Sequence, residues 1–243
     1  MSGAPPTAAI VVIGDEVLSG KVTDLNSPFL IRELYARGVK IVEVRVIADQ
    51  VDGIAATVRE LSLRVDHLFT TGGIGPTHDD VTLEAVAKAV SRPLAQSETI
   101  AARIRARHPE ASLRMAMVPE GAQVELAGGG VVPVISVDNV YVLPGVPSLM
   151  RACFEKIGAR FVGTPFVSRA IYLDAHETEF AEVLAGIQQA HREVAIGSYP
   201  RFDAAPYRVK VTVDGADAKA VAAAYEEIRA KMDPSWIVVD PGE

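Results

Sequence analysis

The residues best suited to chemistry lie in one short stretch, TTGGIGPTHDD, which runs from Thr70 to Asp80. Gly72, Gly73 and Gly75 follow an apolar run and precede an expected helix. Glycine lets the backbone approach a ligand closely, and its N–H groups can then point at a phosphate or a similar anion. Turns also use glycine where φ is positive, so a tight turn without a ligand explains the three glycines equally well.

Two adjacent carboxylates, Asp79 and Asp80, complete this stretch. Capping a helix needs only one of them. Two carboxylates beside a loop that binds an anion would repel a bare phosphate. The arrangement is favourable if a divalent ion bridges the carboxylate and phosphate oxygens. We therefore expect Asp79 and Asp80 to bind a metal and the glycines to bind phosphate. Mg²⁺ is the first candidate, with Mn²⁺ and Co²⁺ as alternatives.

Further carboxylates follow other expected strands. Asp15 and Glu16 come after the first apolar run, and Asp49 comes after the second. In an open α/β sheet the ligand crevice lies beyond the carboxyl ends of the strands, so these side chains should gather near the glycines. A solvated loop explains any one of them alone, and their shared location is the stronger argument.

A second loop, LPGVPS, follows another expected strand and ends at Ser148. Two prolines around Gly145 make a stiff turn, and Ser148 with the first N–H groups of the next helix can bind an anion. A rigid turn with a serine cap explains the loop equally well. Among the 5 histidines, only His78 lies where it would touch a ligand, and Cys153 fits a buried helix face.

Strands and helices alternate through the first part of the chain, which predicts a right-handed, mainly parallel sheet with helices on both faces. Short apolar and β-branched runs predict the strands. Ser27, Asp52 and Thr82 are placed as N-caps of three helices. The expected strands cover 8–13, 39–47, 65–71 and 140–143, a further helix starts near 148, and 120–139 reads as a hairpin or loop.

After Gly163 and Pro165 the expected order of elements changes to strand (166–173), helix (177–190), strand (194–199), strand (207–213), helix (216–232) and strand (236–239). This order is the split βαβ of ferredoxin-like modules. The sequence therefore predicts a three-layer αβα domain at 1–164 and a smaller α+β ferredoxin-like module at 165–243.

The amino-acid composition and the net charge argue against some classes of partner. The chain has 243 residues, 49% of them hydrophobic and 23% charged, which is the balance of a water-soluble globular protein. Its formal net charge of −7 argues against nucleic acid as a partner. We find neither an apolar run of membrane-spanning length nor a secretory leader, so we expect a cytoplasmic protein without a membrane partner.

Three motifs in the same order suggest a family. IGDEVLSGKVTDLNSPFL, TTGGIGPTHDDVTLEAVAKA and VYVLPGVPSLM together resemble the molybdopterin-binding domain shared by molybdopterin adenylyltransferases, the CinA family and the N-terminal domain of eukaryotic FAD synthases. GGIGPTHDD and the later GSYPRFDAAPYRVKVTVD are most similar to the CinA and FAD synthase branch. The resemblance implies a three-layer fold that binds a small nucleotide or pterin ligand at the carboxyl edge of the sheet, and a homo-oligomer.

The resemblance also assigns site residues. It implies that Asp49 and Asp80 serve catalysis and metal binding, that Gly72, Gly73 and Gly75 form the phosphate loop, that 144–148 form the second ligand loop, and that molybdopterin is a candidate ligand. With the paired carboxylates, we predict Asp49 and Asp80 as catalytic and Asp79 and Asp80 as metal ligands. The residues that we predict to bind ligand or phosphate are Gly14, Asp15, Glu16, Ser19, Gly20, Gly72, Gly73, Gly75, Thr77, His78, Pro144, Gly145, Pro147 and Ser148.

Members of the CinA branch are associated with metal-dependent hydrolysis of ADP-ribose, and the corresponding FAD synthase domain with hydrolysis of FAD. The resemblance therefore implies a metal-dependent pyrophosphatase that releases AMP from such a compound. A molybdopterin- or nucleotide-binding module without turnover is the alternative of another class. Adenylyl transfer to molybdopterin is disfavoured, because Asp79 stands where the adenylyltransferases carry a basic residue. Synthesis of FAD is not expected from 243 residues, which leave no room for the adenylyltransferase domain.

Overall fold

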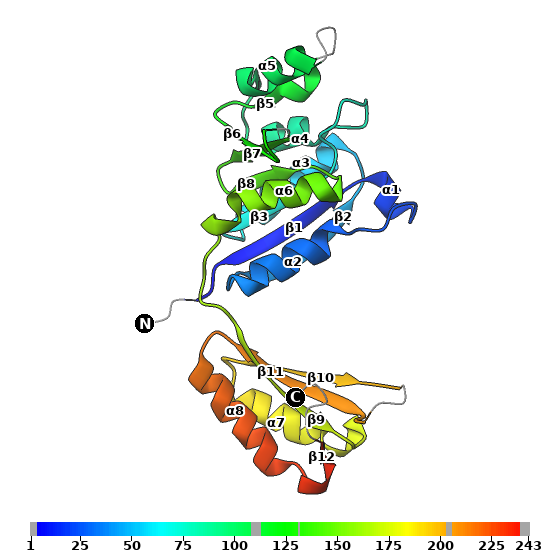
Figure 1. The fold of residues 1–243 in the computed structure, drawn as a ribbon, viewed down its shortest axis with the longest axis vertical. Coiled ribbons are helices and arrows are strands. Elements are labelled where there is room, and N and C mark those ends of the chain that lie inside the picture. Colours follow the sequence, from blue (N-terminus) through cyan, green and yellow to red (C-terminus); the bar gives the residue numbers. More distant parts are fainter. Residues whose placement is uncertain (1–3, 108–112, 131, 203–205, 239–243) are drawn as a thin grey trace. The chain divides into compact units, whose positions relative to one another are not determined.

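The apolar runs predicted to be strands form a sheet in the computed structural model (Figure 1). The structure describes residues 4–107, 113–130, 132–202 and 206–238. The chain divides into two units, 1–163 and 164–243. Each unit buries apolar clusters of its own, so each has its own core.

The strands of the first unit are β1 (Thr7–Ile13), β2 (Lys40–Ile47), β3 (His67–Thr71), β4 (Leu94–Gln96), β5 (Met117–Pro119), β6 (Gln123–Ala127), β7 (Val132–Val137) and β8 (Val140–Leu143). The main sheet has the order β2-β1-β3-β8-β7-β6. β2, β1, β3 and β8 are parallel, whereas the β6–β7 hairpin joins antiparallel. The predicted mainly parallel sheet is confirmed, and the stretch predicted as a hairpin or loop supplies two of its strands.

The helices of the first unit are α1 (Asp15–Leu18), α2 (Asn26–Ala36), α3 (Val51–Ser62), α4 (Thr82–Ala89), α5 (Glu98–Arg107) and α6 (Pro147–Ile157), with 3₁₀ turns at Leu113–Ala116 and Gly158–Arg160. α2 and α6 cover one face of the sheet, and α3 and α4 cover the other (Figure 1). This is the predicted three-layer arrangement.

The central strand β1 shows why its sequence is apolar without alternation. Ile10 and Val12 pack in the cluster under α2 and α6, while Val11 and Ile13 pack in the cluster under α3 and α4. A parallel strand covered on both faces must be apolar at every position. The edge strand β2 instead alternates between exposed and half-buried residues.

Two of the predicted N-caps are wrong for a common reason. α2 begins at Asn26, and Asp24 Oδ1 accepts the N–H groups of Asn26 at 2.9 Å and Ser27 at 3.0 Å. Asp52 lies inside the first turn of α3 and forms an ion pair with Lys88 at 2.6 Å. In both helices another contact of a short polar side chain replaces the expected cap, a local one in α2 and a tertiary one in α3.

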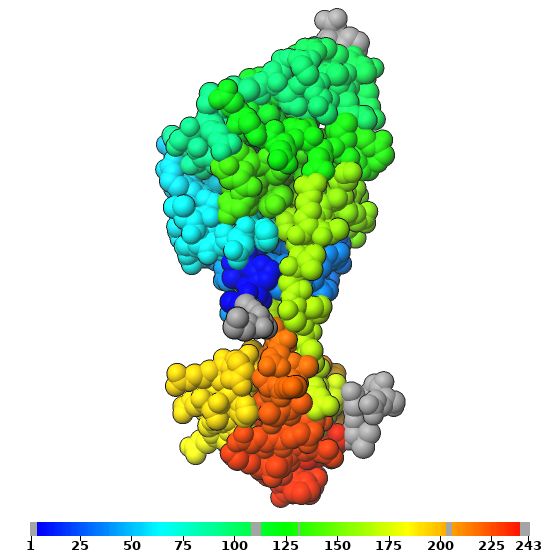
Figure 2. Space-filling model, turned by 90° about the vertical axis from the view of Figure 1, so that its left-hand side faces the viewer, coloured from blue at the N-terminus to red at the C-terminus, as the bar shows by residue number. Residues whose placement is uncertain are grey.

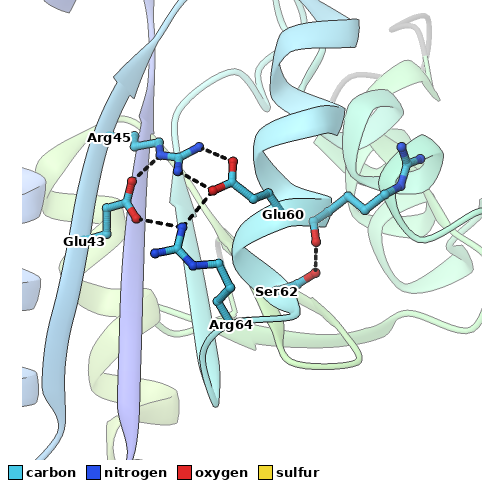
Figure 3. Close-up of polar contacts among 6 residues, drawn as sticks. Glu43, Arg45, Glu60, Ser62 and Arg64 are labelled. Carbon is cyan, nitrogen blue, oxygen red and sulfur yellow. Dashed lines mark hydrogen bonds and ion pairs between the residues drawn. The ribbon is translucent and has the colours of Figure 1, made fainter.

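An ion-pair network joins the edge strand β2 to α3 (Figure 3). Arg45 donates to both carboxylate oxygens of Glu60 at 2.7 Å each, and Arg64 donates to Glu60 at 2.7 Å. Glu43 completes the network by pairing with Arg45 and Arg64. The Arg45 hydrogen bonds, with those from Arg64, hold the pKa of Glu60 at about 2. Charged side chains on an edge strand also oppose unwanted strand pairing.

We predict that Glu60→Gln lowers the free energy of unfolding at pH 7. A carboxylate with a depressed folded pKa stabilises the fold above its unfolded pKa of 4.5, and this contribution is lost as the pH falls toward about 2. The effect is modest because the group is exposed and screened. Urea unfolding across this pH range checks it, with Glu155→Gln on α6 as control, since Glu155 has no ion pair in the described part of the chain. Equal urea midpoints for wild type and Glu60→Gln at pH 7 would contradict the prediction.

The second unit contains β9 (Val167–Leu173), α7 (Ala181–Ala190), β10 (Ala195–Pro200), β11 (Val209–Gly215), α8 (Ala218–Lys231) and β12 (Ile237–Val238), with 3₁₀ turns at Glu177–Glu179 and Pro234–Trp236. Its antiparallel sheet has the order β10-β11-β9-β12. The predicted α+β module is therefore confirmed. Val239, predicted as the last residue of the final strand, lies outside the described residues. None of the helices in the described ranges is both long and apolar enough to cross a membrane.

Candidate functional site

The predicted site residues gather where the parallel strands end. The glycine-rich loop follows β3, the LPGVPS loop follows β8, and Gly14 follows β1. Two backbone hydrogen bonds tie these ends together: Gly14 N–H donates to Ile47 O at 3.1 Å, and Gly72 N–H donates to Leu143 O at 3.2 Å. Since β1 also pairs with β3, the ends of β2, β1, β3 and β8 lie side by side and form the floor of the site.

Gly72 lies at the centre of this floor. Its φ of 101° lies in the region that only glycine adopts readily. A Cβ at this position would overlap the carbonyl oxygen of Ile13. A Cβ on Gly145 would lie 3.2 Å from Gly72 Cα, so the loops after β3 and β8 are in contact. Close backbone packing, and not only a tight turn, requires glycine here.

Asp80 closes the glycine-rich loop on itself. Its Oδ1 accepts the Gly75 N–H at 2.6 Å, and its Oδ2 accepts the Thr77 N–H at 2.8 Å and the Thr77 hydroxyl at 2.5 Å. Because each carboxylate oxygen has two lone pairs, only one acceptor position on Oδ1 remains for a metal or a ligand. Asp80 thus shapes the loop whether or not it binds a metal.

Thr82 is not the N-cap of α4, as the sequence predicted, but its first residue. Its hydroxyl donates to Gly72 O at 2.9 Å, and its N–H donates to Gly73 O at 3.0 Å. The N–H groups of Gly72 and Gly75 are engaged as well, whereas those of Gly73 and Ile74 have no acceptor among the described residues. These two N–H groups are the ones left to bind an anion.

Arg114 holds the same loop from outside, and the sequence analysis missed it. Its guanidinium donates to Thr77 O at 3.1 Å, His78 O at 3.4 Å and Asp80 O at 3.2 Å. A planar fork of five N–H donors suits several carbonyl oxygens at once. Contacts across more than 30 positions of sequence leave no local signal, so Arg114 could not have been found by spacing.

Asn26 is a second residue that the sequence analysis missed. It is buried on α2, and its Nδ2 donates to Gly145 O at 2.8 Å, which fixes the loop after β8. Its Oδ1 is buried without a hydrogen-bond donor, as are the hydroxyls of Thr70 and Thr71 at the end of β3. Buried polar atoms normally find a partner, so water or a ligand is expected to reach this part of the site.

Asp49 is the carboxylate with the most unusual surroundings. Its Oδ2 accepts the Asp15 N–H at 2.8 Å, and its Oδ1 has no donor among the described residues. Burial raises the pKa of Asp49, and the negative charges of Glu16, Asp15 and Asp79 add to this increase. A carboxylate whose pKa is raised in this way is a good binding partner for a cation or a proton.

A cavity of about 880 Å³ opens beside the glycine-rich loop. A volume in this range accommodates a cofactor-sized ligand. Most of its wall is apolar, from α4, α5, the β6–β7 hairpin and the loop before α6. The predicted site residues that line it are Glu16, Gly72, Gly73, Gly75, Asp80, Pro144, Gly145 and Pro147.

The remaining predicted residues lie outside the cavity wall. Gly14, Asp15 and Asp49 belong to the adjoining strand ends. The His78 side chain is 98% exposed, and Ser19 and Gly20 are exposed beyond α1. Val146, not Ser148, is the N-cap of α6. The roles assigned to these residues remain predictions.

The carboxylates do not form a complete protein cage for a metal. In the described ranges, no group of three or more His, Cys, Asp or Glu side chains is arranged to hold an ion. Mg²⁺ commonly binds through one or two carboxylates together with substrate phosphates and water. The exposed carboxylate of Asp79 and the remaining position on Asp80 are the groups that could bind in that mode.

The fold and the strand-end site define an α/β protein of the molybdopterin-binding type. A family model described as a probable molybdopterin-binding domain matches residues 9–164, and the model of the FAD synthase middle domain matches residues 165–241. The chain belongs to the molybdopterin-binding domain family, as the resemblance of its motifs indicated.

Similar proteins extend this comparison. A protein from Archaeoglobus fulgidus is 34% identical, over 90% of this chain and 94% of its own length. A probable FAD synthase from Caenorhabditis briggsae is 31% identical over 87% of this chain, which spans only 47% of that protein. The solved structure of the protein CinA from Thermoplasma acidophilum, 26% identical, superimposes with a TM-score of 0.60 over 64% of this chain and 99% of its own. The likeness to the CinA and FAD synthase branch is confirmed.

Proposed function

We propose that this chain is a metal-dependent hydrolase of a nucleotide diphosphate compound such as FAD or ADP-ribose, and that it releases AMP. The observation that carries the proposal is Asp49. A half-buried carboxylate with a raised pKa and one free oxygen lies beside Gly73 of the glycine-rich loop, and Gly73 lines a cavity of about 880 Å³. The probable FAD synthase among the similar proteins supports FAD as a substrate.

The glycine-rich loop would orient the pyrophosphate. The free N–H groups of Gly73 and Ile74 donate to phosphate oxygens, and the unpaired N–H groups at the start of α6, from Ser148 and Leu149, face the same strand edge. Asp80 and Arg114 hold the loop in this conformation. Because the donors are fixed before the substrate arrives, they need little rearrangement during the reaction.

Asp49 would act on the attacking water. Its Oδ1 accepts a proton as the water oxygen bonds to phosphorus, the bridging P–O bond breaks, and the departing phosphate keeps the bridging oxygen. FAD would yield AMP and FMN, and ADP-ribose would yield AMP and ribose 5-phosphate. Asp79 and Asp80 would hold the divalent ion, which would supply Lewis-acid polarisation of the phosphoryl oxygens.

AMP release tests the proposal. The purified chain is incubated with FAD, ADP-ribose or NAD and with Mg²⁺, Mn²⁺ or Co²⁺, and AMP is measured by chromatography against an EDTA control. Metal-dependent AMP from one substrate, lost in Asp80→Asn, is the expected result. If folded Asp80→Asn protein keeps its activity, Asp80 is not a catalytic or metal-binding residue. If no combination of substrate and metal yields AMP, the proposed hydrolase is refuted.

One observation favours a second candidate, a binding module without turnover. Asp80 accepts three hydrogen bonds from its own loop. In the described part of the chain, no three His, Cys, Asp or Glu side chains are arranged to hold a metal ion. Such a module would hold a nucleotide or molybdopterin in the same cavity. It predicts that FAD or molybdopterin raises the melting temperature equally with and without EDTA, while no AMP forms.

A further inference from the structure

The cavity has two chemically different ends. Glu16 and Asp80 line it beside the strand ends, whereas Arg103 and Arg107 of α5 line it elsewhere. Arg103 lies against the turn of the β6–β7 hairpin, because a Cβ on Gly130 would overlap its guanidinium. β7 is two strands away from β3 in the sheet, and two strand spacings amount to about 10 Å. The strand that follows the turn beside Arg103 is thus displaced by about 10 Å across the sheet from the strand that leads into the glycine-rich loop.

The hairpin turn lies on the same edge of the sheet as the glycine-rich loop. β7 runs antiparallel to β8 and pairs Ile135 with Val142, so the start of β7 lies beside the end of β8. A ligand can therefore extend from one end of the cavity to the other along this edge. In the space-filling view the teal and green surface of the segment from α5 to β7 forms one end of the first unit, and the blue N-terminal residues lie at the other (Figure 2).

The wall between the two ends is apolar. Leu83, Ile100, Ile104 and Ile135 line it, together with Pro144, Val146, Pro147 and Leu149 of the loop after β8. Among the described residues that line the cavity, none carries a side-chain hydroxyl or amide group. An apolar surface of this kind suits a flat aromatic ring system.

The two arginines are available to a ligand. They lie four residues apart, on one face of α5. Neither has a hydrogen bond or an ion pair among the residues that the structure describes. Arg105, on the same helix, pairs with Glu98 at 3.1 Å and does not line the cavity. Unpaired guanidinium groups beside an apolar wall can stack on a ring and donate to oxygens at its edge.

We propose that Arg103 and Arg107 are specificity-determining residues that recognise the ring end of the substrate. A fused heteroaromatic ring lies on the apolar wall, and carbonyl oxygens at its edge accept hydrogen bonds from the two guanidinium groups. Flavins and pterins share this chemistry. The inference rests on the proposed function, because it assigns the second half of a ligand whose pyrophosphate occupies the glycine-rich loop.

Binding without turnover provides the test. Quenching of riboflavin fluorescence, and separately of the fluorescence of a free pterin, is titrated in EDTA with wild type, Arg103→Ala, Arg107→Ala and the matched control Arg105→Ala. We expect the dissociation constant of at least one ring probe to rise about tenfold in Arg103→Ala and in Arg107→Ala. Arg105→Ala should stay within about twofold of wild type. Thermal unfolding confirms that each variant is folded.

Three results would overturn the inference. The first is unchanged binding of both rings in Arg103→Ala and Arg107→Ala. The second is a loss restricted to FMN and FAD, titrated under the same conditions, with riboflavin unaffected, because the arginines would then bind phosphate. The third is failure of the wild type to bind either ring. A larger loss for the pterin than for riboflavin supports the inference and identifies the ring.

The outcomes separate this inference from the hydrolase. If the two variants lose ring binding and the wild type releases no AMP, the ring site is supported and the proposed hydrolase is refuted. If the wild type releases AMP and ring binding does not depend on Arg103 and Arg107, the hydrolase is supported and the ring site is refuted.

Discussion

Asp49→Asn is expected to lower AMP release by about 100-fold or more, the usual contribution of a general base, without destabilising the fold. The Asp49 carboxylate is half-buried among Glu16, Asp15 and Asp79, and its pKa is raised above the ordinary value of 3.8. Asparagine has nearly the same shape and keeps an oxygen for the Asp15 N–H. It removes the negative charge that burial penalises.

The sign of the stability change follows from the raised pKa. Above its folded pKa the Asp49 carboxylate is charged and costs stability, whereas below 3.8 it is protonated in both states and costs none. In EDTA at pH 7, Asp49→Asn should therefore melt at the wild-type temperature or above. The shift in melting temperature that Mg²⁺ or Mn²⁺ causes in the wild type should shrink in the variant, because a negative charge close to Asp79 is lost.

Asp52→Asn is the matched control, three residues further along the chain. Asp52 is exposed, pairs with Lys88 at 2.6 Å, and has a pKa lowered by that hydrogen bond. Its replacement should lower the melting temperature slightly and leave AMP release unchanged, which is the reverse of the Asp49 pattern. Wild-type turnover in Asp49→Asn, or a clear fall in its melting temperature in EDTA, would contradict the assignment.

Gly72→Ala is expected to cost about 2–4 kcal/mol of unfolding free energy, the range for strained backbone combined with a steric overlap. Alanine at a φ of 101° is strained, and its Cβ would overlap the Ile13 carbonyl, which cannot move without shifting β1. Since Gly72 also contacts Gly145, the loops that shape the site should separate. Urea unfolding measures the loss.

Gly129→Ala separates the two causes. Gly129 has a positive φ of 66°, but a Cβ there would meet nothing within 4 Å. This variant should show the backbone strain alone, about 1–2 kcal/mol. If Gly72→Ala were no more destabilising than Gly129→Ala, close packing at the strand ends would not be the reason for glycine at position 72.

The sequence predicted the parts of the fold that depend on periodicity. The strand at Val140–Leu143 has the bounds that its apolar run indicated, and the order of elements in the second unit follows the predicted pattern. Burial on both faces leaves a continuous apolar run that can be recognised locally. The convergence of Gly72, Gly145 and Asp49 followed from the rule that ligands lie at the carboxyl edge.

Residues whose role depends on distant partners could not be predicted in the same way. Thr82 is of a residue type that favours N-caps, but its hydroxyl donates to Gly72 O in the loop after β3. Arg114 and Arg103 look like ordinary charged surface residues in sequence. Their positions over the glycine-rich loop and the hairpin turn depend on how α5 and the residues after it pack on the sheet.

The two sides of the cavity come from different parts of the chain. The strand ends that would bind phosphate are tied together across β1, β3 and β8, so a substitution there disturbs the whole sheet. Much of the apolar wall comes instead from α5 and the β6–β7 hairpin, and Leu83 and the loop after β8 complete it. Substitutions on α5 and the hairpin are therefore expected to change which ring the cavity accepts without disturbing the packing of Gly72 against Ile13 and Gly145.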